Sequence, residues 1–133
     1  MNFRNYSIDE NLPLLMMVDS SKVATSYMAF QIREGDLKLI DMDSRVFSGP
    51  EMSAPSVSRE AMGICYGLRK LEVLIRNHAN KTVLFTDCSS LIFFSRAGSY
   101  NSKFFEMALF LSSFPRLEVV SFPGRCMVLR DER

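Results

Sequence analysis

Three stretches in the first half of the chain have the polar and apolar patterns of β-strands. Residues 14–18 (LLMMV) are apolar without interruption, which is typical of a strand covered on both faces. Residues 25–32 and 37–47 alternate between apolar and polar side chains with a period of two. Short polar turns separate the three stretches, so they predict an antiparallel meander. In the last stretch, the residues expected to face the core are Leu37, Leu39 and either Met42 or Val46.

The rest of the chain alternates between helix and strand patterns. After a loop at 48–55 (SGPEMSAP), apolar residues recur at three- and four-residue spacing from Val57 to Ile75. This pattern predicts a long helix with Ser56 as its N-cap and an end near residues 77–80. The later patterns predict a strand at 82–86, a short helix at 89–96, a helix from 101 or 102 to before Pro115, and a strand at 117–122.

These elements predict one α/β domain over residues 1–133, with a polar leader at 1–11 and a terminal segment at 125–133 that frays at its end. We expect a five-stranded mixed sheet, made of the three-strand antiparallel meander plus two parallel strands, with helices on both faces. Right-handed crossovers would place the strand at 82–86 parallel to and beside the strand at 14–18. Open α/β sheets bind ligands at the carboxyl ends of such strands.

Composition and charge narrow the possible classes of function. The chain of 133 residues is 47% hydrophobic and 23% charged, which is typical of an ordered domain. No apolar run approaches the roughly 20 residues of a membrane span. The first residues also lack the apolar stretch of a signal peptide, so we expect a soluble, intracellular protein with no membrane partner. The net charge of +1 provides no general attraction for nucleic acid, so such binding must come from local patches.

The cysteines and the single histidine do not indicate a thiol-based site. Cys65, Cys88 and Cys126 are odd in number and lack C-x-x-C spacing, so neither a disulfide framework nor a zinc ribbon is expected. A zinc site made of Cys88, Cys126 and His78 is the alternative. Cys65 lies on the apolar side of the predicted helix and is expected in the core, whereas His78 is expected to cap the end of that helix.

Acidic residues lie where an apolar strand ends or a helix begins. Asp19 and Asp87 follow strand patterns, Glu60 lies in the first turns of the predicted helix, and Asp131 lies in the terminal segment. Two carboxylates at the ends of neighbouring buried strands repel each other unless a cation lies between them. Each residue also has a local explanation, because Asp caps the segment after a strand and Glu stabilises the first turn of a helix. Their joint placement favours a magnesium site for phosphodiester chemistry.

A family resemblance rests on blocks of sequence that occur in order. They are 18–21 (VDSS), 44–51 (SRVFSGPE), 85–91 (FTDCSSL), and a stretch from 107–111 (MALFL) to 122–124 (FPG). Glu60 follows the second block by nine residues, and Asp131 lies seven residues beyond Gly124. In this arrangement the chain resembles the RNase H domain of gypsy-type LTR retrotransposons and of retroviral-like reverse transcriptases. The likeness runs from about Leu12 to the end of the chain, although Ala24 and Ser26 stand where the family usually has glycines.

The resemblance implies a ribonuclease H that hydrolyses the RNA strand of RNA·DNA hybrids, as a domain of a reverse transcriptase polyprotein. In that class, two Mg²⁺ ions about 3.5–4 Å apart stabilise the attacking water and the leaving oxygen, and Mn²⁺ can substitute. By correspondence with the family's motifs, Asp19 would bridge the two ions, Glu60 and Asp87 would hold one of them, and Asp131 would hold the other. The implied partners are the hybrid and the polymerase domain of the same polyprotein. The implied location is the cytoplasm, within virus-like particles.

Small polar side chains and one arginine near the carboxylates are the candidates for substrate binding, since they can contact phosphates and ribose hydroxyls. They are Ser20, Ser21, Ser89, Ser90 and Arg96. One alternative is a catalytically degenerate RNase H fold that serves as a structural connection or a domesticated interaction module, because Arg130 adjoins Asp131 near the end of the sequence. Another is a nuclease or transposase acting on DNA, although such proteins usually have a basic surface that this composition does not provide.

Overall fold

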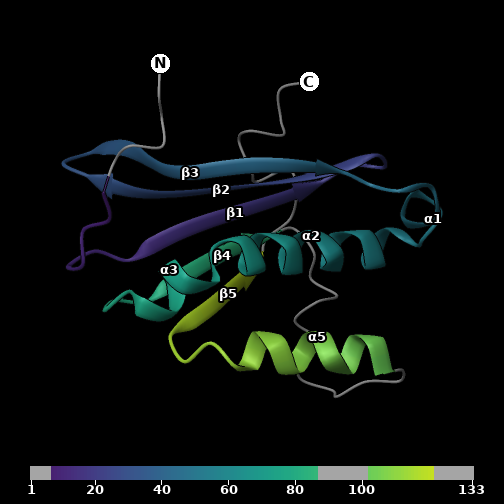
Figure 1. Ribbon diagram of the computed structural model, residues 1–133. Coiled ribbons are helices and arrows are strands. Elements are labelled where there is room, and N and C mark those ends of the chain that lie inside the picture. Colours follow the sequence, from purple (N-terminus) through teal and green to yellow (C-terminus); the bar gives the residue numbers. More distant parts are fainter. Residues whose placement is uncertain (1–6, 87–101, 122–133) are drawn as a thin grey trace.

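A five-stranded mixed sheet forms the centre of the molecule (Figure 1). The computed structural model describes residues 7–86 and 102–121. Its strands are β1 (Leu14–Ser20), β2 (Ala24–Arg33), β3 (Asp36–Val46), β4 (Thr82–Thr86) and β5 (Leu117–Ser121), in the spatial order β3-β2-β1-β4-β5. Consecutive strands from β1 to β3 pair antiparallel, and β4 is parallel to both β1 and β5. The predicted meander and the predicted position of β4 beside β1 are confirmed.

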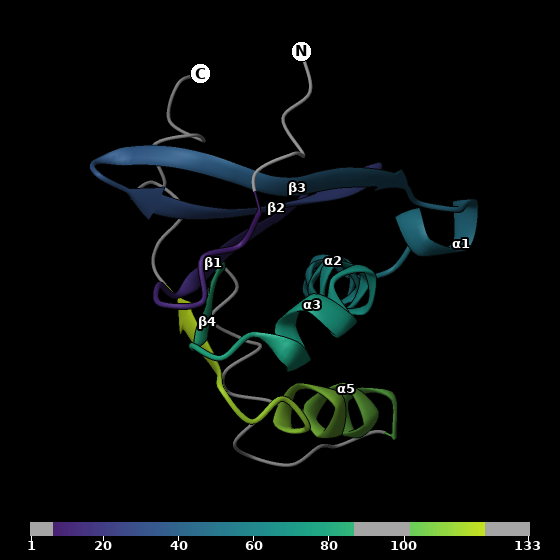
Figure 2. The same cartoon turned by 60° about the vertical axis from the view of Figure 1, so that its left-hand side comes forward.

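Three helices of the described residues lie on one face of this sheet, and a short helix lies beyond the ends of the strands (Figure 1 and Figure 2). The three are α2 (Ser56–Lys70), α3 (Glu72–Asn77) and α5 (Ser102–Ser112), and the short helix is α1 (Gly49–Met52). Figure 2 shows α2, α3 and α5 on the same side of the strands. The short helix expected at 89–96 and the terminal segment at 125–133 lie outside the described residues, so helices on the second face stay a prediction. None of the described helices is long and apolar enough to cross a membrane.

Close packing of α2 on β1 and β2 creates the core. Alternate residues of β1, namely Leu14, Met16 and Val18, belong to the core cluster and are at most 5% exposed. A Cβ atom at Gly67 would lie 2.6 Å from Met16 Cε and 3.2 Å from Tyr27 Cβ, so glycine allows this turn of α2 to approach the sheet closely. The core also contains buried residues of α2, α3 and the chain around α5, among them Ala61, Ile64, Leu68, Ile75, Leu111 and Phe114.

A β-bulge changes which residues of β3 face the core. The register between β2 and β3 shifts after Ala29, which pairs with Asp41, because Phe30 pairs with Leu39. Ile40 is the additional residue, and both Leu39 and Ile40 are therefore buried. The inward positions expected from a regular alternation were wrong except at Leu39. The residues found exposed instead are Leu37, Met42 and Val46.

The helix boundaries differ from the prediction at both ends of the long helix. The N-cap of α2 is Pro55, and Ser56 is the first helical residue. The helix expected to continue to residues 77–80 is interrupted at Leu71, where α2 ends and α3 begins. The loop expected at 48–55 contains the short helix α1, which begins with a capping box formed by Ser48 and Glu51.

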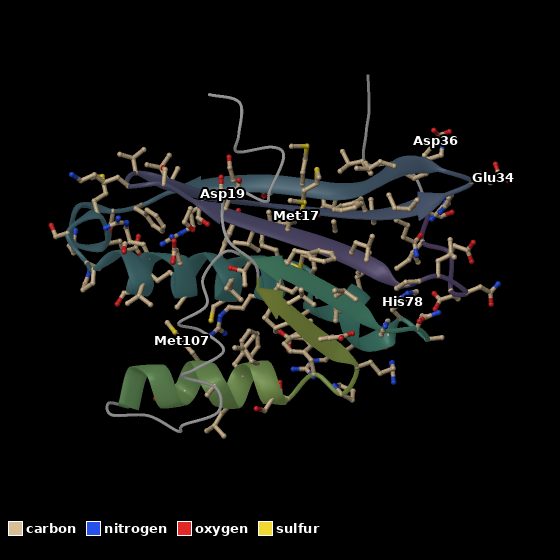
Figure 3. The ribbon with its side chains drawn as sticks, turned by 180° about the vertical axis from the view of Figure 1, so that it is seen from behind. Met17, Asp19, Glu34, Asp36, His78 and Met107 are labelled. Carbon is tan, nitrogen blue, oxygen red and sulfur yellow. The ribbon has the colours of Figure 1, made fainter. Side chains whose placement is uncertain are left out.

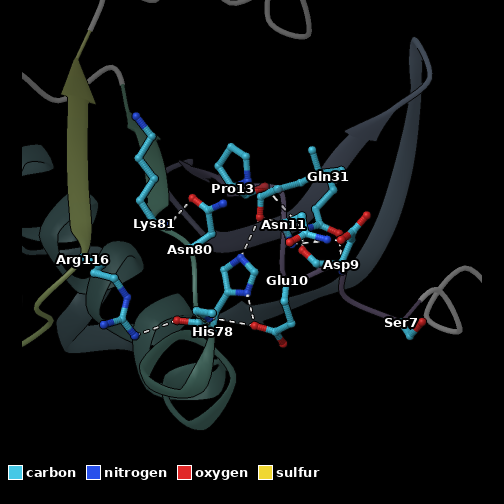
Figure 4. A network of polar contacts seen from close by, with 12 residues as sticks. Ser7, Asp9, Glu10, Asn11, Pro13, Gln31, His78, Asn80, Lys81 and Arg116 are labelled. Carbon is cyan, nitrogen blue, oxygen red and sulfur yellow. Dashed lines mark hydrogen bonds and ion pairs between the residues drawn. The ribbon is translucent and has the colours of Figure 1, made fainter.

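Two buried polar side chains hold the segment that precedes β1 (Figure 4). The side-chain amide of Gln31 donates to Asp9 O at 2.9 Å and to Leu12 O at 3.2 Å, and its oxygen accepts from the Asp9 N–H at 2.9 Å. His78 is the C-cap of α3, as the sequence predicts. Its ring is buried, however, and lies against the same segment, with Nδ1 3.2 Å from Glu10 Oε1 and Nε2 2.8 Å from Leu12 O. Both ring nitrogens face acceptor oxygens, so both donate only when the ring is protonated.

Replacement of Glu10 by glutamine tests this network through the pH dependence of stability. The backbone N–H of Ala79, 2.7 Å from Glu10 Oε1, together with His78, holds the pKa of Glu10 below its ordinary value of 4.5. Such a carboxylate stabilises the fold above its unfolded-state pKa, and that stabilisation is lost as the pH falls through its folded-state pKa. We expect Glu10→Gln to lower the melting temperature at neutral pH and this difference to shrink in acid. Thermal unfolding followed by circular dichroism checks this, and a difference that does not depend on pH would contradict it.

Candidate functional site

The carboxyl ends of the parallel strands meet at one edge of the sheet. Met17 of β1 lies opposite Phe85 of β4, and Thr86 of β4 lies opposite Ser121 of β5. Asp19 is the next-to-last residue of β1 and therefore lies at this edge. Figure 3 shows Asp19 toward the end of the sheet that is opposite the β2–β3 turn at Glu34. Asp19 thus lies at the edge where open α/β sheets bind ligands.

Asp19 lies on the face of the sheet that points away from α2. Side chains alternate along a strand, and the neighbours Val18 and Ser20 point toward α2, where Val18 is buried in the core. Asp19 is exposed and pairs with Ser26 of β2 across the ladder. The carboxylate is therefore accessible to a ligand at the edge of the sheet.

Glu60 reaches the same edge from the first turns of α2. Ser20, which follows Asp19, donates from its hydroxyl to the carbonyl oxygen of Arg59 at 3.5 Å, and Arg59 precedes Glu60. The guanidinium of Arg59 donates to Ala54 O at 2.6 Å, which joins the loop before α2 to the helix. A contact between the chain neighbours of Asp19 and Glu60 thus joins the end of β1 to the first turns of α2.

A small hollow lies at this junction. Its volume is about 130 Å³, and its lining combines one carboxylate, two cationic side chains and three hydroxyls, from Ser20, Ser21, Lys22, Ser56, Arg59 and Glu60. A larger cavity of about 390 Å³ lies between α2 and α5 and shares no lining residue with it. The larger cavity holds none of the predicted catalytic residues, whereas the small hollow is lined by Glu60 and by the predicted substrate contacts Ser20 and Ser21.

Asp19 and Glu60 have the chemistry of magnesium ligands. Carboxylate oxygens such as those of Asp19 and Glu60 are the ligands that Mg²⁺ prefers, and Mg²⁺ is commonly held by one or two carboxylates together with water and substrate phosphates. Burial raises the pKa of the Cys65 thiol, so this cysteine stays a neutral core residue, as the sequence predicts. In residues 7–86 and 102–121, no group of three or more His, Cys, Asp or Glu side chains could hold a metal ion.

The remaining predicted site residues lie outside the part of the chain that the structure describes. They are Asp87, Asp131, Ser89, Ser90 and Arg96, and their roles stay predictions, as does a zinc site involving Cys88 and Cys126. Ser20 and Ser21 are described and lie at the hollow. Ser21 Oγ accepts from the Ala24 N–H at 3.1 Å and so forms part of the β1–β2 turn. Substrate binding by Ser20 and Ser21 is a prediction that these contacts do not test.

Gly63 is a residue of the site that the sequence reading missed. A Cβ atom at this position would lie 2.2 Å from Thr25 Oγ1 and 2.5 Å from Ser20 Oγ. Gly63 therefore allows α2 to approach the end of β1 closely enough for the Ser20–Arg59 contact. The signal in the sequence is the spacing of Gly63 and Gly67, which puts two residues without side chains on one face of a helix.

Comparison with known proteins identifies the family. Residues 9–114 match the model of the RNase H-like domain found in reverse transcriptase. The chain belongs to this family. Among curated proteins, no significant match was found.

Solved structures of related fold are similar to the chain over most of its length. The foamy virus protease-reverse transcriptase in complex with RNA/DNA hybrid has 16% sequence identity and a TM-score of 0.69, covering 87% of this chain and 16% of that chain. LC11-RNase H1, isolated from compost, has 10% identity and a TM-score of 0.61, covering 90% of this chain and 91% of that chain. The N-terminal RNase H domain of a Mycobacterium tuberculosis protein has 15% identity and a TM-score of 0.57, covering 85% and 84%. At these identities the likeness shows the RNase H-like fold, and the chain spans a quarter or less of the foamy virus proteins.

Substitution of Gly63 by alanine tests the close approach of α2 to β1. Alanine gains about 1 kcal/mol over glycine in a helix. Overpacking against a buried neighbour typically costs about 1–3 kcal/mol, and Thr25 is 1% exposed and cannot move into solvent. We therefore expect Gly63→Ala to lower the free energy of unfolding, as measured by urea denaturation. The control is Gly49→Ala, because no heavy atom lies within 4 Å of a Cβ atom there. Equal stability of the two variants would contradict close packing at Gly63.

Proposed function

We propose that the chain is a metal-dependent ribonuclease H that cleaves the RNA strand of RNA·DNA hybrids. The observation that carries the proposal is the Ser20–Arg59 contact, which joins the carboxyl end of β1, where Asp19 lies, to the first turns of α2, where Glu60 lies. Membership of the reverse transcriptase RNase H-like family supports it, as does the resemblance of the sequence blocks around the two residues to the motifs of that family.

In the proposed mechanism, the residues of this chain bind and orient the reacting groups. Two Mg²⁺ ions, when bound, would acidify the attacking water and stabilise the leaving 3′-oxygen. Asp19 and Glu60 would hold these ions, together with Asp87, which follows β4 in the sequence, and Asp131. Ser20, Ser21, Ser89, Ser90 and Arg96 are the proposed contacts to the phosphates and ribose hydroxyls of the hybrid.

The proposed partners are the hybrid and a polymerase domain in the same polyprotein, and the proposed location is the cytoplasm, within virus-like particles. Structures of the foamy virus protease-reverse transcriptase and of LC11-RNase H1 were solved with RNA/DNA hybrid. The net charge of +1 provides little general attraction for nucleic acid. We propose that an adjoining polymerase supplies much of the affinity for the hybrid.

Hybrid cleavage by carboxylate variants is the direct test. Asp19→Asn, Glu60→Gln and Asp87→Asn each remove an anionic ligand with little change in side-chain size. We expect each to lower Mg²⁺-dependent cleavage of a labelled hybrid more than about 100-fold while the fold stays intact, since even supporting residues of metal sites cost about 10–100-fold. Asp131→Asn should have a smaller effect because its ion would keep other ligands and water.

The controls distinguish the proposal from its alternatives. Single-stranded RNA and duplex DNA should not be cleaved, and preferential cleavage of DNA would favour another class of nuclease. Strong hybrid cleavage that survives Asp87→Asn would contradict the proposed metal site. Complete inactivity of the folded wild type, with a polymerase domain attached, would favour a degenerate structural module.

Metal-dependent stability provides a test that needs no activity. Carboxylates gathered at one edge repel each other, and a bound cation removes this repulsion. We expect millimolar Mg²⁺ or Mn²⁺ to raise the melting temperature of the wild type. Asp19→Asn should melt higher than the wild type without metal and should lose the response to metal. Differential scanning calorimetry measures both effects, and two proteins that ignore the metal and melt alike would show that the carboxylates are not clustered.

A further inference from the structure

A pair of hydroxyl groups lies between the end of the sheet and α2. Thr25 is 1% exposed, and its Oγ1 lies 2.7 Å from Ser20 Oγ. The Thr25 hydroxyl also lies within donating distance of the carbonyl oxygen of Asp19, at 3.3 Å, and Ser20 Oγ lies 3.5 Å from the carbonyl oxygen of Arg59. The pair therefore connects the backbone of Asp19 with the backbone of the residue that precedes Glu60.

The protons of the pair can be arranged in two ways. Each hydroxyl has one proton to donate, so only two of the three contacts (Thr25–Ser20, Thr25–Asp19 O and Ser20–Arg59 O) can be hydrogen bonds at one time. In one arrangement, Thr25 donates to Ser20, and Ser20 donates to Arg59 O, which joins β2 to α2. In the other, Ser20 donates to Thr25, and Thr25 donates to Asp19 O, which joins β2 to β1. Both hydroxyls take part in both arrangements. In the first arrangement, the bond from Thr25 holds Ser20 Oγ in the position from which it donates to Arg59 O.

Among the polar contacts of the described residues, the Ser20–Arg59 contact joins the first turns of α2 to the sheet, and other contacts join its second half. Farther along α2, the hydroxyl of Tyr66 donates to Ser44 O at 3.2 Å, and Lys70 Nζ lies 3.5 Å from Asp43 Oδ2. Gly67 packs on Met16, as described above. Loss of the hydroxyl at position 25 would therefore leave the second half of α2 attached to β1 and β3 and would loosen the half that carries Glu60.

We propose that Thr25 is a positioning residue that fixes the turn of α2 carrying Glu60 relative to Asp19. The proposal rests on the proposed function, since it gives the pair a role in the same site. Thr25 does not touch the reacting groups in this scheme. It acts by fixing where the carboxylate of Glu60 lies when a metal ion and the hybrid bind.

Thr25→Val is the test variant because valine keeps the shape of threonine and removes the hydroxyl. The matched control is Thr82→Val, since Thr82 is also 1% exposed and its Oγ1 has no hydrogen-bond partner among the described residues. Thr25→Ser, which restores a hydroxyl, is the rescue variant. All measurements use the full chain, with Mg²⁺ as the metal.

Two readouts separate positioning from general stability. Hydrogen exchange of the metal-free protein should become faster for Thr25→Val at backbone amides of residues 56–63 and stay unchanged at residues 64–70. The Mg²⁺ concentration that gives half of the maximal rate of hybrid cleavage should rise about tenfold, with KM for the hybrid unchanged, as for supporting residues of metal sites. Thr25→Ser should restore both, and Thr82→Val should change neither.

The outcomes that overturn the proposal are distinct from those that overturn the proposed function. Two results for Thr25→Val would show that Thr25 does not position Glu60. One is faster hydrogen exchange throughout the sheet and α2. The other is hydrogen exchange and Mg²⁺ dependence like those of Thr82→Val. Should the wild type fail to cleave the hybrid even with a polymerase domain attached, the proposed function fails. In that case the exchange of the metal-free variants still shows whether Thr25 holds the first turns of α2.

Discussion

The structure depends on the short distance between α2 and the first two strands. Two glycines on one face of α2 make this distance possible, because side chains of β1 and β2 occupy the space where Cβ atoms would be. Gly67 accommodates Met16 in the core, and Gly63 accommodates Ser20 and Thr25 at the edge. The same packing thus builds the apolar core at one end of the helix and a polar contact at the other. The position of Glu60 relative to Asp19 follows from the packing of the whole helix.

Buried polar groups are satisfied at the other end of the sheet as well. Gln31 and His78 are almost inaccessible to solvent, and both bond to the segment that precedes β1. Arg116, which precedes β5, donates to the carbonyl oxygen of His78 at 2.7 Å. A buried polar group without a partner is costly, so these contacts specify one path for the chain entering β1. The two polar clusters lie at opposite ends of β1, and the apolar core lies between them.

Much of the fold could be predicted from the sequence because its signals are local. The uninterrupted apolar run of β1, the alternation in β2, and the helical spacing from Val57 to Ile75 each reflect burial on one or two faces of a single element. The prediction was wrong where tertiary structure overrides the local pattern. A bulge opposite Phe30 reverses the faces of β3, and Leu71 interrupts a helix whose apolar spacing continues across the break.

The candidate site was predicted only in part. Asp19 and Glu60 stand out because each carboxylate ends a strand or begins a helix, and their shared edge follows from the order of the strands. Thr25 carries no such signal, because a threonine in a strand is ordinary. Gly63 is indicated by its spacing from Gly67, but its contact with Thr25 is visible only in the structure. Roles that depend on two elements meeting cannot be read from either element alone.

The long strand β3 has a consequence for how the domain behaves among other copies of itself. It spans 11 residues and lies at the end of the strand order, so among the described residues one side of its backbone pairs with no other strand. Charged side chains recur along it, at Asp36, Lys38, Asp41, Asp43 and Arg45, and the bulge opposite Phe30 distorts its ladder. Charges and bulges on an edge strand disfavour the addition of strands from other molecules. The irregularity that made this strand hard to predict therefore also protects the sheet from aggregation.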